Sequence, residues 1–109
     1  MAVYLQALPQ QDRKAPATVA APPASAMARG SKVYEQQCAQ CHGDQGQGEP
    51  GAFPALAGNR AVLLADPTNL VRVVLQGGYL PATAGNPRPH GMPPFQQTLS
   101  DEEVAAVTT

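Results

Sequence analysis

The five residues 38–42 read CAQCH, which is a C-x-x-C-H motif. Two intervening residues place the Cys38 and Cys41 sulfurs on one side of a helical turn, where each sulfur can add across one vinyl group of a haem. The next residue, His42, can then direct its imidazole at the iron from the proximal side. The motif therefore predicts one covalently attached haem c, with His42 as a ligand of the iron.

Two other interpretations of the cysteine pair compete with haem attachment. The first is a redox dithiol or a local disulfide. A thioredoxin-like dithiol should follow a strand and open a helix, whereas this pair closes a predicted helix that no strand precedes. A zinc site could combine both thiols with His42 and His90. Adjacent Cys41 and His42 can hardly bind one tetrahedral ion without strain. We therefore favour haem attachment over both alternatives.

A second iron ligand is expected from residues 91–95, which read GMPPF. The thioether of Met92 is a soft ligand that favours reduced iron and raises the reduction potential. The flanking prolines fit a rigid, extended loop that holds the sulfur with little loss of entropy. The competing possibilities are that Met92 is a core or plain loop residue, or that His90 is the ligand in its place.

The composition independently indicates a bound group. The chain has 109 residues, of which 43% are hydrophobic, 5% aromatic and 14% charged, with 10 Gly, 12 Pro and no Trp. Such a small, loop-rich chain with a thin core usually needs a disulfide, metal or cofactor for stability. The net charge of −1 offers no basic excess for a phosphate backbone, so no nucleic-acid partner is expected. No apolar run approaches the length of a transmembrane segment, so none is predicted.

The sequence predicts an all-α fold of short helices and long loops, because no alternating strand pattern occurs. The expected helices are, in chain order, residues 32–40 behind a Ser31 N-cap, a helix opened by Asp66-Pro67 and stopped by Gly77-Gly78, and a last helix opened by the capping box 100–103. Val71, Val74 and Leu75 are expected to pack in the core. Residues 79–98 contain five prolines, and a loop of that length usually carries function.

Three segments are predicted along the chain. Residues 1–8 form a helix remnant of a preceding domain, residues 9–30 an Ala/Pro-rich linker, and residues 31–109 the compact domain. The remnant carries three apolar side chains, Tyr4, Leu5 and Leu8. We favour a disordered tail for these residues, with packing back on the same domain or on a neighbour's as the alternative.

With these motifs in place, residues 31–109 resemble a class I c-type cytochrome. The shared features are C-x-x-C-H near the start, a helix in the middle, and a Met-Pro loop about fifty residues on, before a final helix. The resemblance implies three to four short helices and long loops wrapped around one covalent haem. It implies electron transfer without substrate chemistry, and it favours Met92 over His90 as the partner of His42.

The stretch FPALAG at residues 53–58 resembles the family's loop under the proximal face of the haem. The resemblance implies that the carbonyl of Pro54 accepts a hydrogen bond from Nδ1 of His42. Such a bond would fix the tautomer and make the other ring nitrogen a better donor to iron. It also implies that Leu56 packs on the haem ring.

A narrower resemblance is to the last haem domain of multihaem cytochrome subunits of membrane-bound alcohol, aldehyde or gluconate dehydrogenases. It is carried by residues 1–9, the linker, Tyr79 and the stretch HGMP at 90–93. It implies redox partners: a dehydrogenase subunit, other haem domains, and a quinone or oxidase side. It also implies a periplasmic or periplasm-facing location. Family members normally continue the last helix with an aromatic residue that crosses the first helix, so the last helix is expected to be truncated here.

A few candidates and one alternative function remain open. Tyr79, Arg60 and Arg88 could contact haem propionates, or could be loop and surface residues. The alternative function is a haem enzyme or gas sensor, which needs an open position on the iron. The presence of a plausible second ligand, Met92, favours electron transfer.

Overall fold

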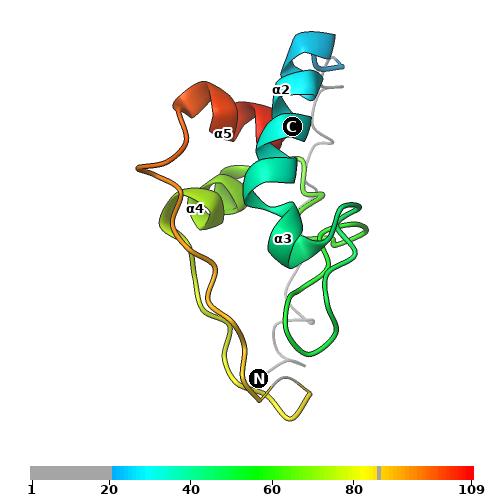
Figure 1. Ribbon diagram of the computed structural model, residues 1–109, viewed down its shortest axis with the longest axis vertical. Helices are drawn as coiled ribbons and strands as arrows, with labels where there is room; N and C mark the ends of the chain where they lie inside the picture. The colour runs from blue at the N-terminus through cyan, green and yellow to red at the C-terminus, as the bar shows by residue number, and fades with distance from the viewer. Residues whose placement is uncertain (1–20, 86) are drawn as a thin grey trace, which may run out of the picture.

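The computed structural model describes residues 21–85 and 87–109, and the helix remnant predicted over residues 1–8 lies outside them. The helices are α2 (Ala24–Gln37), α3 (Ala39–His42), α4 (Thr68–Gln76) and α5 (Asp101–Val107), shown in Figure 1. The described residues contain no strand, and isolated bridges pair Glu49 with Phe53 and Gly78 with Met92. The predicted all-α class is confirmed.

Helix α2 begins at Ala24, seven residues before the predicted N-cap at Ser31, and Pro23 is its N-cap. The helix thus includes residues 24–30, which were predicted to belong to the linker, and the predicted N-cap at Ser31 is wrong. The physical reason is composition, because residues 24–29 read ASAMAR and alanine is the best helix former. Ser31 lies in the middle of the helix.

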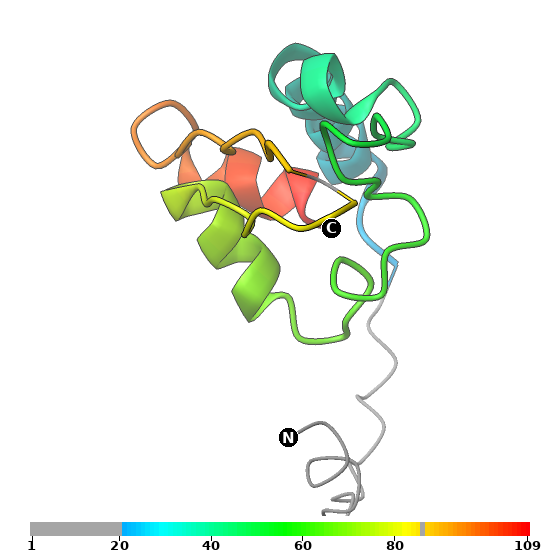
Figure 2. The same cartoon turned by 90° about the horizontal axis from the view of Figure 1, so that it is seen from below.

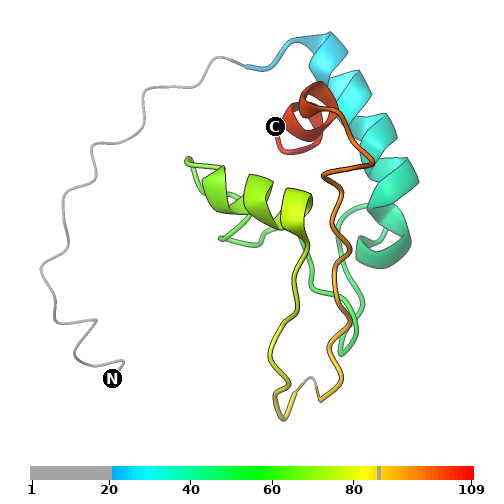
Figure 3. The same cartoon turned by 90° about the vertical axis from the view of Figure 1, so that its left-hand side faces the viewer.

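Gly30, inside α2, marks the place where the first and last helices cross. Its position is buried, and a Cβ built there would overlap the carbonyl oxygen of Ala106 in α5. Figure 3 shows α5 lying against α2. Val33 and Val104 are each only 5% exposed. The glycine therefore lets two helix backbones approach more closely than any side chain would allow.

Helix α4 supplies the rest of a thin core. Val74, Phe95 and Val104 form the buried cluster, and Val71, Leu75, Met92 and Leu99 pack against it. The predicted core residues of this helix are thus confirmed. No side chain in the described residues is less than 2% exposed, which fits a fold that a cofactor completes.

The last two helices begin near the residues that the sequence predicts. Asp66 Oδ1 accepts a hydrogen bond from the Thr68 amide at 2.9 Å, and Pro67 is the N-cap of α4. In α5 the predicted capping box is present. The Ser100 amide donates to Glu103 Oε2 at 2.9 Å, and the Glu103 amide donates to Ser100 Oγ at 3.3 Å.

Two long loops extend to the same side of the molecule (Figures 1 and 3). One follows α3 and covers residues 44–58. The other leaves the end of α4 at Gly77 and returns to Phe95, with its two limbs running side by side, as Figure 3 shows. Figure 2 views both loops from below. Between them these loops and the ends of α3 and α4 carry the predicted site residues.

Candidate haem site

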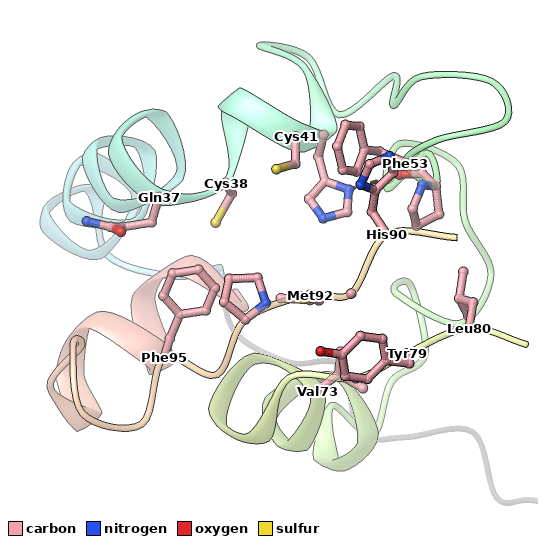
Figure 4. Close-up of a pocket in the computed structure, with 15 residues that line it drawn as sticks. Gln37, Cys38, Cys41, Phe53, Val73, Tyr79, Leu80, His90, Met92 and Phe95 are labelled. Carbon is pink, nitrogen blue, oxygen red and sulfur yellow. Dashed lines mark hydrogen bonds between the residues drawn. The ribbon is translucent and has the colours of Figure 1, made fainter. Parts of the chain in front are cut away.

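Helix α3 presents the C-x-x-C-H motif as one tight turn. The amides of Cys41 and His42 donate to the carbonyl oxygen of Cys38 at 3.2 and 2.9 Å. Gly43, with φ +80°, then stops the helix. Figure 4 shows the sulfurs of Cys38 and Cys41 projecting from this turn toward the segment that carries Met92. Two thiols therefore stand on one wall of a shared pocket.

The two cysteines are free and half-buried, so they form no disulfide with each other. Burial, and secondarily the neighbouring Cys41, raise the pKa of the Cys38 thiol. Reactive dithiols of the thioredoxin type have a lowered pKa instead. The environment of Cys38 therefore argues against the redox-dithiol alternative.

His42 is buried, at 8% exposure, and its Nδ1 lies 2.9 Å from the carbonyl oxygen of Pro54. A carbonyl can only accept a hydrogen bond, so Nδ1 carries the proton and Nε2 keeps its lone pair. The predicted hydrogen bond between His42 and Pro54 is confirmed. The second ring nitrogen is thus held in the form that binds a metal ion.

A tight turn places the Pro54 carbonyl under His42. The Gly48 amide donates to the carbonyl of His42 at 2.7 Å, and the Glu49 amide donates to the carbonyl of Phe53 at 2.9 Å. Gly48 has φ +67°, and a Cβ there would lie 2.6 Å from the Phe53 oxygen. Only glycine fits where the backbone at position 48 crosses that of Phe53, so Gly48 fixes the conformation of the 44–58 loop.

Leu56, expected on the haem ring, is not among the residues that line the pocket. The amides of Leu56 and Ala57 both donate to the carbonyl of Gly46, at 2.8 and 2.9 Å. These bonds hold Leu56 against the Gly46 turn. The structure therefore does not bring Leu56 together with the other predicted site residues.

Met92 lies across the pocket, on the returning limb of the long loop (Figure 4). Its backbone pairs with Gly78 through two hydrogen bonds, of 2.8 and 3.1 Å. Its side chain is half-buried against the core cluster. His90 also lines the pocket but is exposed, with its ring centroid 4.8 Å from that of Phe53. The two candidate distal ligands thus differ in burial, and Met92 is the more enclosed.

The pocket itself is apolar and has about 910 Å³ of empty space, including the part that opens to solvent. Beyond the predicted site residues, its lining includes Gln37, Phe53, Val73, Gly78, Tyr79, Leu80, His90, Gly91, Pro93 and Phe95. Val73 is 45% and Tyr79 88% exposed, so apolar surface faces this space. Arg60 and Arg88 are not in the lining. The sequence analysis did not predict Val73 as a pocket residue. The one indication was that Val73 is apolar but does not share the core-facing side of α4.

This donor set fits a haem. Two thiols, an imidazole with a free Nε2 and a thioether line one apolar space. A zinc site is not supported, since no group of three or more His, Cys, Asp or Glu side chains in the described residues could hold a metal ion. These four side chains and the apolar pocket lining match what a haem needs when it is attached by two thioether bonds and bound by two axial ligands.

The fold and site together define a class I c-type cytochrome domain. The chain belongs to the family described as cytochrome c oxidase, cbb3-type, subunit III, which it matches over residues 25–109. Its cofactor is a covalently bound haem c, and its function is electron transfer through that haem. The family and the names of its relatives support an electron-transfer role rather than a catalytic one.

Relatives of known name agree with this assignment. The cytochrome c subunit of the quinone alcohol dehydrogenase of Gluconobacter oxydans is 47% identical over 78 residues, which are 72% of this chain and 16% of that protein. Cytochrome c-552 of Thermus thermophilus is 42% identical over 87 residues, 77% of this chain and 58% of that protein. The gluconate 2-dehydrogenase cytochrome c subunit of Pantoea cypripedii is 38% identical over 79 residues, 72% of this chain and 18% of that protein. The chain thus spans less than a fifth of the length of the dehydrogenase subunits it matches here.

Proposed function

We propose that this chain carries electrons as one haem domain of a dehydrogenase cytochrome subunit, with His42 and Met92 as the axial ligands of the iron. Cys38 and Cys41 would each form one thioether bond to the haem. The observation that carries the proposal is that His42, with its tautomer fixed by Pro54, and Met92 line the same apolar pocket from separate elements.

The bound haem supplies an iron centre that gains and loses one electron. The residues of the chain control that exchange. The Pro54 carbonyl orients His42 and raises the basicity of its Nε2. The thioether of Met92 favours the reduced iron, and apolar walls disfavour the extra charge of the oxidised state, so both raise the potential.

The second candidate function, a haem enzyme or gas sensor, requires a vacant position on the iron. Met92 stands against this candidate because its backbone is fixed by two hydrogen bonds and its side chain packs against the core. A ligand held in this way does not leave the iron readily. Electron transfer through a six-coordinate haem is therefore the better-supported function.

The partners and location follow by analogy with the relatives. Their names place similar domains in alcohol and gluconate dehydrogenases, so we expect the dehydrogenase catalytic subunit to supply electrons. Other haem domains, a quinone or an oxidase would accept them. Among the described residues, no helix has the length and apolar character needed to cross a bilayer. Because thioether attachment takes place outside the bacterial cytoplasm in this family, we place the domain on the periplasmic side of the inner membrane.

The test is reduction by a dehydrogenase. Oxidised haem-loaded protein is mixed with the purified catalytic subunit of a quinone-dependent alcohol dehydrogenase, and haem reduction is followed by absorbance after ethanol is added. We expect reduction that depends on both ethanol and the subunit. A haem that dithionite reduces but that the dehydrogenase and ethanol leave oxidised would contradict the dehydrogenase role. It would leave the electron-transfer class untouched.

A further inference from the structure

The end of α4 is joined to the Met92 segment by backbone contacts. The Met92 amide donates to the Gly78 carbonyl at 2.8 Å, and the Gly78 amide donates to the Met92 carbonyl at 3.1 Å. Three residues further on, the Phe95 amide donates to the carbonyl of Val74 at 3.0 Å. The segment that bears the Met92 sulfur is therefore fastened to the last turn of α4 on both sides.

Gly77 lies at the closest point of this junction. It ends α4 with φ +69° and ψ −166°, a backbone conformation that is essentially restricted to glycine. A Cβ built on Gly77 would overlap the carbonyl oxygen of Met92. It would also lie 2.9 Å from both the Pro93 carbonyl carbon and the Pro94 nitrogen.

The atoms in the way are all backbone, and they belong to a Met-Pro-Pro segment. A flexible side-chain end could turn aside, but backbone fixed by two prolines has few other conformations. A side chain at position 77 must therefore push the Met92 backbone away from α4. The sulfur moves with that backbone, whereas His42 belongs to α3 and the proximal loop and stays where it is.

We propose that Gly77 is a positioning residue for the sixth iron ligand: the absence of a Cβ there lets the Met92 backbone lie against α4, from which its thioether reaches the iron. The proposal rests on the proposed His42 and Met92 ligation. Gly77 does not line the pocket itself, and it acts on the ligation through the position of the Met92 backbone.

A role in helix termination alone would also make Gly77 sensitive to substitution, so a control glycine with a similar positive φ is needed. Gly58 supplies it. Its φ is +71°, close to that of Gly77, but nothing lies within 4 Å of a Cβ built on it. An alanine at either position meets an unfavourable φ, and only alanine at position 77 meets the Met92 backbone.

The experiment compares Gly77→Ala and Gly58→Ala with the unaltered protein, each loaded with haem. For each we measure the sulfur-to-iron charge-transfer band near the red end of the visible spectrum, carbon monoxide binding to the reduced protein, and the thermal midpoint. We expect Gly77→Ala to lose the band and bind carbon monoxide. Gly58→Ala should keep the band and exclude carbon monoxide even where its thermal midpoint falls.

A Gly77→Ala protein that keeps the band and excludes carbon monoxide would overturn the proposal. If this variant yields no folded protein, amide hydrogen exchange in the unaltered reduced protein decides instead. The Gly78 and Met92 amides should then be protected, and free exchange alongside intact methionine ligation would overturn the proposal. A missing band in the unaltered protein would refute the ligation by Met92 itself, which is a separate failure.

Discussion

Nδ1 of His42 lies 2.9 Å from the carbonyl oxygen of Pro54, and this contact sets the chemistry of the proximal side. Because Pro54 offers only an acceptor, the proton resides on Nδ1 and the lone pair on Nε2. The loop that supplies the carbonyl is in turn fixed by Gly48, which crosses the backbone of residues 53–55. Helix α3, the 44–58 loop and the His42 side chain are thus held together by these contacts.

The first prediction concerns Gly48. Gly48→Ala should displace the Pro54 carbonyl, because its Cβ would lie 2.6 to 2.7 Å from backbone atoms of residues 53–55. We expect a loss of about 1–3 kcal/mol relative to Gly51→Ala, the usual range for overpacking. Gly51 has φ +78° with nothing within 4 Å of a Cβ, so it controls for backbone strain.

The measurement is thermal unfolding of both haem-loaded variants, with the His42 Nδ1 proton followed by NMR in the reduced state. That proton should exchange slowly in the unaltered protein and faster in Gly48→Ala. Equal stability of the two variants, together with a protected Nδ1 proton in both, would show that the loop does not hold the histidine.

The second prediction concerns the crossing of α2 and α5. Replacing a glycine by alanine in a helix interior normally stabilises the helix by about 1 kcal/mol. For Gly30→Ala we expect a net loss of about 1–3 kcal/mol, because the new Cβ overlaps the Ala106 carbonyl. Ser31→Ala, at an exposed position of the same helix, should change the free energy of unfolding little. Denaturant unfolding measures both, and a stabilised Gly30→Ala protein would refute the close crossing.

The third prediction separates the two candidate distal ligands. Met92→Ala should open the iron, allow carbon monoxide to bind and lower the reduction potential, because a soft ligand that favours reduced iron is lost. His90→Ala should leave the potential and the spectrum nearly unchanged, since His90 is exposed and contacts Phe53. Potentiometric titration and carbon monoxide spectra of both variants provide the check. The reverse pattern would assign the ligand to His90.

The fourth prediction concerns the thioether bonds. The intact mass of the denatured, matured protein should exceed that of the polypeptide by one haem. Cys38→Ser and Cys41→Ser should each retain haem through the remaining bond, with a shifted absorption band, and the double variant should release all haem on denaturation. If matured, denatured protein has the mass of the bare chain, covalent attachment is wrong.

Much of the site was accessible from the sequence because its signals are local. The spacing of Cys38, Cys41 and His42 and the capping box at Ser100 each depend on residues a few positions apart. The Pro54 carbonyl was found through the family pattern and not through spacing. Met92 was predicted from its soft thioether and from flanking prolines that fit a rigid loop, and it lines the pocket, while its bond to iron stays a prediction.

The missed features depend on residues far apart in the chain. Ser31 is a good N-cap by type, yet the alanines before it extend the helix to Ala24 and the packing of Gly30 on α5 stabilises the longer helix. Val73 lines the pocket because of how α4 is oriented relative to the rest of the domain. Leu56 does not line the pocket, and its amide donates to the Gly46 carbonyl. These contacts are set by tertiary structure, which local sequence patterns do not encode.

If His42 and Met92 both bind the iron, the domain passes electrons and binds no substrate. The absorption spectrum of the reduced, unaltered protein with and without carbon monoxide decides between this ligation and an open iron. We expect a low-spin, six-coordinate spectrum that carbon monoxide does not change. A spectrum that shifts on adding carbon monoxide at neutral pH would show an open iron position and would exclude ligation by both residues.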